Sequence, residues 1–363
     1  MEKFIPYIFF FFILIITGCD PATKPASGLE DEIYIVADLA EFEELRPVLE
    51  TTFEKIIYTP QPEKLFKLNR ISVNEIEKHK NKKNLIIAAP LNSNSTTSQF
   101  IKAVVDSASR MKLVETNGFF IKKYDLWAKD QLVMILTSTE MRKLQSDILR
   151  NKDDLLNSFQ QISDKRLYSS LYNKKYEQED IEGKLLKDYG WLIFVQSDFK
   201  LALNKSDDNF VWLRHSPNSD MERWIFVYWV ENASPELLNP DSVKAIRNRM
   251  TEKYYRISDD SAYVVIAKDY YTISEINFKG RYAIFTQGLW NLNIKDMSGP
   301  FINYTFYDEK SKRLYMLDGS VFAPKYYKRN LIQQMDVTLQ SFMTVEELNK
   351  ERKEELIKAA EEK

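Results

Sequence analysis

The first half of the chain alternates short, wholly apolar runs with stretches whose apolar residues recur at helical spacing. The runs predict strands that are buried on both faces, and they cover residues 33–37, 85–89 and 132–136. Apolar positions between residues 42 and 53 and between 101 and 111 each predict a helix after the preceding strand. After the third run, an apolar face over residues 141–162 predicts a long helical arm.

The second half changes to apolar runs that are separated by turn residues, a pattern typical of antiparallel strands. The predicted strands are residues 191–195, 199–203, 210–214, 224–230, 263–267, 282–292, 301–307 and 313–322. Helical spacing at 243–250 and at 331–342 places a helix after each group of strands, which leaves an internal duplication of a strands-then-helix unit open. Gly299-Pro300 is interpreted as a turn.

These patterns together predict an α+β fold in which antiparallel sheets pack with helices and a long helical arm lies in the middle of the chain. At 363 residues the chain is long enough for about two domains. We expect an N-terminal α+β domain with the arm at 33–183, a C-terminal antiparallel α+β domain at 184–343 and a charged helix at 344–363. The stripe of apolar residues in that last helix is thin, so we expect it to be solvated and to contribute little to the fold.

The N-terminal segment indicates export and lipid anchoring. Lys3 precedes an apolar run over residues 4–16, which suits a signal peptide and is too short to span a bilayer. The run ends in Ile16-Thr17-Gly18-Cys19, which looks like the lipobox of bacterial lipoproteins. We therefore expect residues 1–18 to be removed, Cys19 to be acylated, and residues 19–32 to form a flexible tether. A buried structural cysteine is the alternative interpretation of Cys19.

Composition excludes several classes of function. Cys19 is the only cysteine and the chain has two histidines, so a metal site built from cysteine and histidine is not expected, and neither is a cofactor. The formal net charge is −2, which argues against a nucleic-acid partner. His79 lies in a charged stretch that is typical of a solvated loop. His215 follows a strand, where an ordinary surface histidine is the simpler interpretation and a general base is the alternative.

Candidate binding residues come from two segments. Trp212 and Arg214 end one predicted strand, and Trp290, Lys328 and Arg329 lie in a cluster between residues 288 and 329. Turns and core packing explain the residues of this cluster without a ligand. The segment 224–230 is apolar on both faces, which favours a central covered strand; a platform of aromatic rings for a sugar or a lipid is the alternative.

The cluster at 288–329, with the segments DNFVWLR at 208–214 and PQPEKLF at 60–66, resembles domain-of-unknown-function lipoproteins from envelopes of Bacteroidetes-type bacteria. The resemblance covers nearly the whole mature chain. It departs at 251–263, where members often carry Pro-Gly and Gly-Ser-Tyr-Met segments that are missing here. The resemblance implies an envelope location and a fold, and it transfers no catalytic residue.

We therefore expect an envelope protein that is anchored to the outer or inner membrane through Cys19 and faces the periplasm. The favoured role is a non-enzymatic binding or assembly module, whose partners are the lipid bilayer and an envelope protein or glycan. The alternative is a protein that binds or acts on glycans. A deep pocket holding carboxylates of shifted pKa favours an enzyme, whereas a flat apolar patch favours a module.

Overall fold

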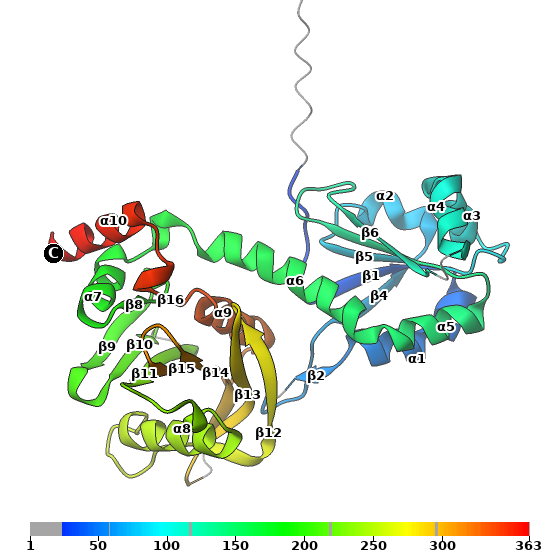
Figure 1. Ribbon diagram of the computed structural model, residues 1–363. Helices are drawn as coiled ribbons and strands as arrows, with labels where there is room; N and C mark the ends of the chain where they lie inside the picture. Colours follow the sequence, from blue (N-terminus) through cyan, green and yellow to red (C-terminus); the bar gives the residue numbers. More distant parts are fainter. Residues whose placement is uncertain (1–23, 58, 116–117, 218–219, 295–296, 363) are drawn as a thin grey trace, which may run out of the picture.

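The computed structural model describes residues 24–362 apart from 58, 116–117, 218–219 and 295–296. The expected signal peptide and Cys19 lie outside these residues. Two α/β bodies are joined by the helix α6 (Lys152–Leu171), which runs between them as the expected helical arm (Figure 1). The α+β class is confirmed. In the described part of the chain, no helix combines the length and the apolar character needed to cross a membrane.

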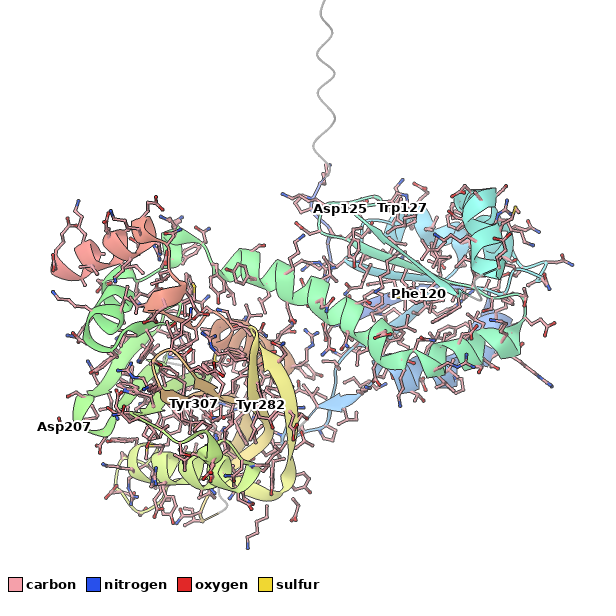
Figure 2. The ribbon with its side chains drawn as sticks, viewed as in Figure 1. Phe120, Asp125, Trp127, Asp207, Tyr282 and Tyr307 are labelled. Carbon is pink, nitrogen blue, oxygen red and sulfur yellow. The ribbon has the colours of Figure 1, made fainter. Side chains whose placement is uncertain are left out.

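The N-terminal domain is built on a five-stranded sheet with the order β4-β1-β5-β7-β6. Its strands are β1 (Glu32–Val36), β4 (Lys67–Ile71), β5 (Asn84–Ala88), β6 (Phe120–Tyr124) and β7 (Leu132–Leu136). Neighbouring strands pair in parallel, except that the edge strand β6 runs antiparallel from Phe120 toward Asp125 (Figure 2). The prediction of antiparallel sheets is therefore wrong for this domain, because the apolar runs that identified its strands carry no information on strand direction.

Helices cover both faces of this sheet. The helices α1 (Leu39–Phe53), α5 (Met141–Arg150) and α6 pack on one face, where Leu45, Leu144 and Phe159 meet the inward side chains of β1, β5 and β7. The opposite face is covered by residues of α2 (Ile76–His79) and α3 (Thr96–Val104). The single helix expected near 101–111 is divided into α3 and α4 (Ser107–Glu115).

The C-terminal domain is built on a seven-stranded antiparallel sheet with the order β12-β13-β14-β15-β11-β10-β9. Its strands are β9 (Lys200–Lys205), β10 (Phe210–His215), β11 (Glu222–Val230), β12 (Val264–Phe278), β13 (Arg281–Leu292), β14 (Ser298–Asp308) and β15 (Arg313–Phe322). As the apolar pattern predicted, β11 is an interior strand, since it pairs with β10 and β15, and it is covered on both faces, since Val227 and Phe226 are buried in the cores on its two sides. Gly299-Pro300 lies inside β14 and not in a turn, so that interpretation was wrong.

Two helices cover opposite faces of this sheet. The helix α8 (Pro240–Tyr254) packs Val243, Ile246 and Met250 on one face, and α9 (Arg329–Leu339) packs Met335 and Leu339 on the other. Each helix follows one group of strands, and the two groups join where β11 pairs with β15. The internal duplication stays a hypothesis, since one group has three strands in this sheet and the other has four.

The C-terminal helix α10 (Lys350–Glu361) is docked, contrary to expectation. Leu356 is fully buried in a small apolar cluster with Leu186 of α7 (Glu179–Tyr189) and Leu192. Thr344 and Glu347 form a capping box, but it opens a 3-10 turn ahead of α10. The boundary expected at 183/184 falls inside α7, a helix that packs into the C-terminal domain through Leu185.

The remaining elements are short. The strands are β2 (Ile56–Ile57) and β3 (Glu63–Lys64), which form a hairpin, and β8 (Trp191–Leu192) and β16 (Met343–Thr344), which pair with each other. The 3-10 turns are η1 (Val73–Glu75), η2 (Lys174–Tyr176), η3 (Ser206–Asp208), η4 (Pro235–Leu237) and η5 (Val345–Glu347).

The expected tether is fixed to the N-terminal domain over its described part. Pro25 pairs with Lys129 and Ser27 pairs with Lys82 in parallel bridges. The Ala26 N–H donates to the carbonyl of Lys129 (2.8 Å), and β1 begins at Glu32. Residues 24–32 are therefore part of the folded body and do not form the expected flexible tether, and residues 19–23 of that tether lie outside the described residues.

Candidate functional site

An aromatic pocket of about 370 Å³ opens in the C-terminal domain, on the side of the sheet that α8 covers. Strand alternation builds it: Trp212 and Arg214 share one face of β10, and Trp224 on β11 is the register partner of Arg214. Trp290 comes from β13. Three of the five predicted binding residues, Trp212, Arg214 and Trp290, are thus brought into one pocket.

Tyr255, directly after α8, holds the rings of this pocket together. Its ring lies 4.8 Å from that of Trp212 and 5.3 Å, edge-on at 71°, from that of Trp224. The Trp224 and Trp290 rings are also 5.3 Å apart. Aromatic rings at these distances attract each other in addition to the free energy gained by burying their apolar surface. The wall of the pocket is therefore preorganised.

Trp290 is placed by a glycine. A Cβ atom at Gly299 would lie 2.9 Å from the Trp290 ring and 2.0 Å from the Val321 carbonyl oxygen, so only glycine leaves room for the ring across β14. The Trp290 indole N–H donates to the same Val321 carbonyl at 3.2 Å. Sequence inspection placed Trp290 in the core, and it is fully buried.

A charged pair forms the polar rim of the pocket. Arg214 donates to Glu222 at 2.7 Å and lies over the Trp212 ring at 5.6 Å. The Trp224 indole N–H donates to the same carboxylate at 2.8 Å. Among the described lining residues Glu222 is the only carboxylate, whereas glycoside hydrolysis uses a pair of them.

Two donors that line the pocket have no protein partner. The hydroxyl of Tyr255 and the indole N–H of Trp212 are buried and make no hydrogen bond. Burial and the nearby carboxylate of Asp318 raise the pKa of Tyr255 well above 10, although Arg247 and Arg214 oppose this, so the hydroxyl keeps its proton. A buried donor without a partner costs free energy, which a ligand with acceptor oxygens would recover.

A buried ion pair lies under α8. The Arg247 guanidinium donates to Asp318 at 2.6 Å, and both side chains are fully inaccessible to solvent. Ser320 and Asn303 also donate to Asp318, at 2.9 and 3.1 Å. The guanidinium stacks 3.7 Å over the Phe301 ring. This network fixes α8 on the sheet, and α8 in turn positions Tyr255.

Lys328 and Arg329 lie elsewhere, at the junction of the two domains. Their backbone N–H groups donate to the Glu63 carboxylate at 2.8–2.9 Å, so a residue of the N-terminal hairpin caps the start of α9. Arg329 also donates to the Leu65 carbonyl at 3.0 Å. These two side chains join the domains and do not contribute to the aromatic pocket.

An interdomain cavity of about 300 Å³ lies beside this junction, lined by residues of α6, α9, β13 and β14. It contains two carboxyl groups. Burial raises the pKa of Asp164 to about 6, partly opposed by a hydrogen bond from Gln333, and burial also raises the pKa of Asp336. Gln333 donates to Asp164 at 2.7 Å and Tyr304 donates to Asp336 at 2.5 Å. Carboxyl groups of shifted pKa in a cavity are the feature expected above of an enzyme, but both groups here already accept hydrogen bonds within the protein.

The two histidines lie apart from both cavities. His79 ends α2 and stacks on Tyr34 with 5.2 Å between ring centres. His215 lies at the end of β10, and its Nδ1 is 3.0 Å from the carbonyl oxygen of Asp198. Neither histidine lines either of these two cavities. His79 was expected in a solvated loop, but it lies in a helix and is half-buried against Tyr34. The described residues hold no group of three or more potential ligands arranged for a metal ion.

Sequence reasoning missed Glu222 and Tyr255. Trp224 was assigned to the covered central strand, and it was considered for binding only within the alternative of an aromatic platform over 224–230. Tyr255 could not be found, because only the docking of α8 brings the residue after it over β10 and β11.

Comparison with known proteins gives two matches to families. Residues 26–172 match the domain of unknown function DUF8532, and residues 177–341 match the domain of unknown function DUF4837. No curated protein sequence matches this chain. The change from one family to the other falls between α6 and α7, where the structure passes from one domain to the next.

Solved structures give only distant similarities. The Ran-binding protein Mog1p of Saccharomyces cerevisiae is 12% identical, with a TM-score of 0.30, and the match covers 43% of this chain and 90% of that one. LpqN of Mycobacterium tuberculosis, described as involved in cell envelope biogenesis, is 12% identical, with a TM-score of 0.25, over 42% of this chain and 82% of that one. Similarities of this size carry no argument. Each family model matches less than half of the chain, and together the two matches support an uncharacterised domain-of-unknown-function family.

Proposed function

We propose that this protein is a lipid-anchored binding module of the bacterial cell envelope, and that its aromatic pocket holds a sugar ring of an envelope glycan. The observation that carries the proposal is the convergence of three tryptophans and Tyr255 on one pocket that also contains two unpartnered donors. The anchor rests on the lipobox-like Ile16-Thr17-Gly18-Cys19.

The chemistry of the pocket favours a sugar over a hydrocarbon chain. The apolar face of a sugar ring stacks on an aromatic side chain, and its oxygens accept hydrogen bonds from groups such as the Tyr255 hydroxyl and the Trp212 indole. A lipid chain would fill the same volume but leave both donors unpaired, at the cost of two buried unsatisfied groups. The single carboxylate at the rim supports recognition without hydrolysis.

A titration of the detergent-solubilised full chain tests this proposal. The probes are the tetramer of N-acetylglucosamine, cellotetraose and maltotetraose, added while tryptophan fluorescence and heat are recorded. We expect at least one probe to bind and the Trp212→Ala variant to bind it about fivefold more weakly, since one lost stacking partner is worth about 1 kcal/mol.

The control is Tyr327→Ala, which removes a ring that is 77% exposed and does not line the aromatic pocket. It should bind as the wild type does. The proposal fails if none of the probes binds, or if Trp212→Ala and Tyr327→Ala bind with the same affinity.

A further inference from the structure

The structure leaves little chain between the proposed lipid anchor and the folded body. The carbonyl of Lys24 accepts a hydrogen bond from the Lys129 N–H (3.0 Å), and Ala26 donates back to the carbonyl of Lys129 (2.8 Å). From Lys24 on, the segment is therefore fixed against residues that follow β6. Lys24 lies five positions after Cys19, and a fully extended chain spans at most about 3.6 Å per position, or about 18 Å here.

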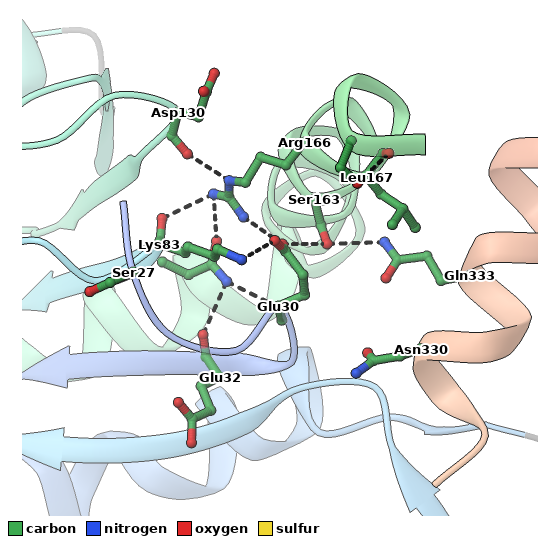
Figure 3. Close-up of polar contacts among 12 residues, drawn as sticks. Ser27, Glu30, Glu32, Lys83, Asp130, Ser163, Arg166, Leu167, Asn330 and Gln333 are labelled. Atoms are coloured by element: carbon green, nitrogen blue, oxygen red, sulfur yellow. Dashed lines mark hydrogen bonds and ion pairs between the residues drawn. The ribbon is translucent and has the colours of Figure 1, made fainter. Parts of the chain in front are cut away.

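Buried polar contacts hold the start of the chain in place (Figure 3). Glu30 accepts hydrogen bonds from Arg166 (2.7 Å) and Ser163 (2.9 Å) of α6 and forms an ion pair with Lys83 (2.6 Å). Burial alone would raise the pKa of Glu30, but the charges of Arg166 and Lys83 outweigh it and lower that pKa. The carboxylate thus stays ionised and the segment stays tied to α6.

The loop over residues 124–130 is fixed at the same end of the domain. Gln131 is fully buried, and its side-chain amide donates to the Lys82 carbonyl at 2.7 Å and accepts from the Trp127 N–H at 3.0 Å. Asp125 and Asp130 hold positive φ angles of 54° and 61° at its two ends. Figure 2 shows Asp125 and Trp127 at the upper edge of the N-terminal domain, near the first described residues.

This end of the domain exposes apolar and basic side chains together. Leu29 and Tyr124 are each 55% exposed and Leu126 is 42% exposed. The exposed lysines are Lys24, Lys123 and Lys129. The carboxylate of Asp125 accepts from the Gln131 N–H at 3.3 Å and so takes part in the turn itself. Apolar and aromatic side chains with flanking lysines suit the interface of an anionic bilayer, where the rings and stems enter the headgroup region and the ammonium groups meet lipid phosphates.

We infer that residues 24–29 and 122–130 form a membrane-facing surface that rests on anionic phospholipid headgroups and fixes the orientation of the N-terminal domain on the bilayer. The inference rests on the proposed acylation of Cys19, which brings this end within about 18 Å of the anchored residue. The opposite end of the sheet, where the parallel strands end and Leu39 begins α1, then faces away from the membrane.

Site-directed spin labelling of the lipidated full chain tests the inference. Cys19 is the only cysteine, so after acylation an introduced cysteine carries the only free thiol. Leu126→Cys is labelled with a nitroxide and reconstituted in vesicles of phosphatidylethanolamine and phosphatidylglycerol. Leu39→Cys is the matched control, since Leu39 is also an exposed leucine, 59% accessible, at the opposite end of the sheet. Accessibility of each label to oxygen and to a polar nickel chelate reports its depth.

We expect the label at 126 to be protected from the nickel chelate and accessible to oxygen, and the label at 39 to remain in water. Adding Lys123→Glu and Lys129→Glu should return the label at 126 to water. If the protein floats with the vesicles but the two labels are equally water-accessible, the inference is wrong while the anchor stands. If the protein does not float, the proposed anchor is wrong, and the inference falls with it.

Discussion

At the scale of single residues, the ion pair of Arg247 and Asp318 is the most constrained contact of the C-terminal domain. Both groups are fully buried, so each has lost its hydration and depends on the other, with Ser320 and Asn303 completing the carboxylate's hydrogen bonds. Sequence inspection could not pair two residues that lie 71 positions apart on different elements.

Removing one partner of this pair should cost more than removing both. We expect Arg247→Met to lower the free energy of unfolding of the C-terminal domain by about 3–5 kcal/mol, because the Asp318 carboxylate is left buried without its counter-charge. The double variant Arg247→Met with Asp318→Leu should recover most of that loss. Urea unfolding followed by tryptophan fluorescence measures both.

The matched control lies on the same helix. Lys253 pairs with Asp208 at the surface, and Lys253→Met should leave the unfolding curve nearly unchanged. A double variant that is as unstable as Arg247→Met would show that the contacts of the Arg247 side chain, and not the stranded charge, set the loss.

At the scale of elements, α10 is a docked helix whose apolar residues recur too weakly for its docking to be predicted from the sequence. Leu356 is its one fully buried side chain, and Gly183 of α7 lets the two helices approach so closely that a Cβ at that glycine would lie 1.9 Å from the Leu356 carbonyl oxygen. Arg352 donates to Glu179 at 2.7 Å and also contacts Glu177 and Glu182. One leucine and one arginine thus hold α10 in place, without the wide apolar face from which sequence inspection predicts docking.

Leu356→Ala should therefore destabilise the C-terminal domain by about 3 kcal/mol, as expected for a fully buried leucine. Lys353→Ala, an exposed change on the same helix, should have little effect. Amides between 351 and 360 should be protected from hydrogen exchange in the wild type and lose that protection in Leu356→Ala. Rapid exchange of these amides in the wild type would restore the expectation of a solvated helix.

At the scale of the whole molecule, the two domains are joined by polar contacts around α9. Glu63 caps its first turn, Gln333 donates to Ser163 (3.0 Å) and Asp164 (2.7 Å) of α6, and the Tyr172 hydroxyl donates to the Val337 carbonyl (2.9 Å). The long arm α6 is therefore a structural strut between the domains, and its inward face carries the carboxyl of Asp164.

The raised pKa of Asp164 predicts a pH dependence of stability. Its folded pKa of about 6 exceeds the usual value of 3.8, so folding favours the protonated form. The stabilisation from this group is complete below pH 4 and is lost as the pH rises through 6. Asp164→Asn, which can still accept from Gln333, should raise stability above pH 6 by at most about 3 kcal/mol and change little below pH 4. Melting temperatures across this range measure the effect, and parallel pH profiles for the two proteins would contradict it.

Local sequence patterns were sufficient for much of the secondary structure. The apolar run at 132–136 is β7, the central position of the segment 224–230 was predicted correctly, and the hairpin turn after Asp308 closes through a hydrogen bond from the Ser311 N–H at 2.9 Å. These features depend on which residues avoid water within one element, and that information is contained in their spacing.

The sequence by itself therefore determined many of the strands and helices and the α+β class, and its composition argued against thiol and histidine-rich chemistry, but β4 and β6 were not among the predicted strands. Only the tertiary structure decided the parallel pairing of the first sheet, the gathering of Trp212, Trp224 and Trp290 under Tyr255, the separation of Lys328 and Arg329 from them, and the docking of α10. The physical reason is that the spacing of apolar residues indicates which side chains are buried. The side chains against which they pack are set by contacts between residues far apart in the chain.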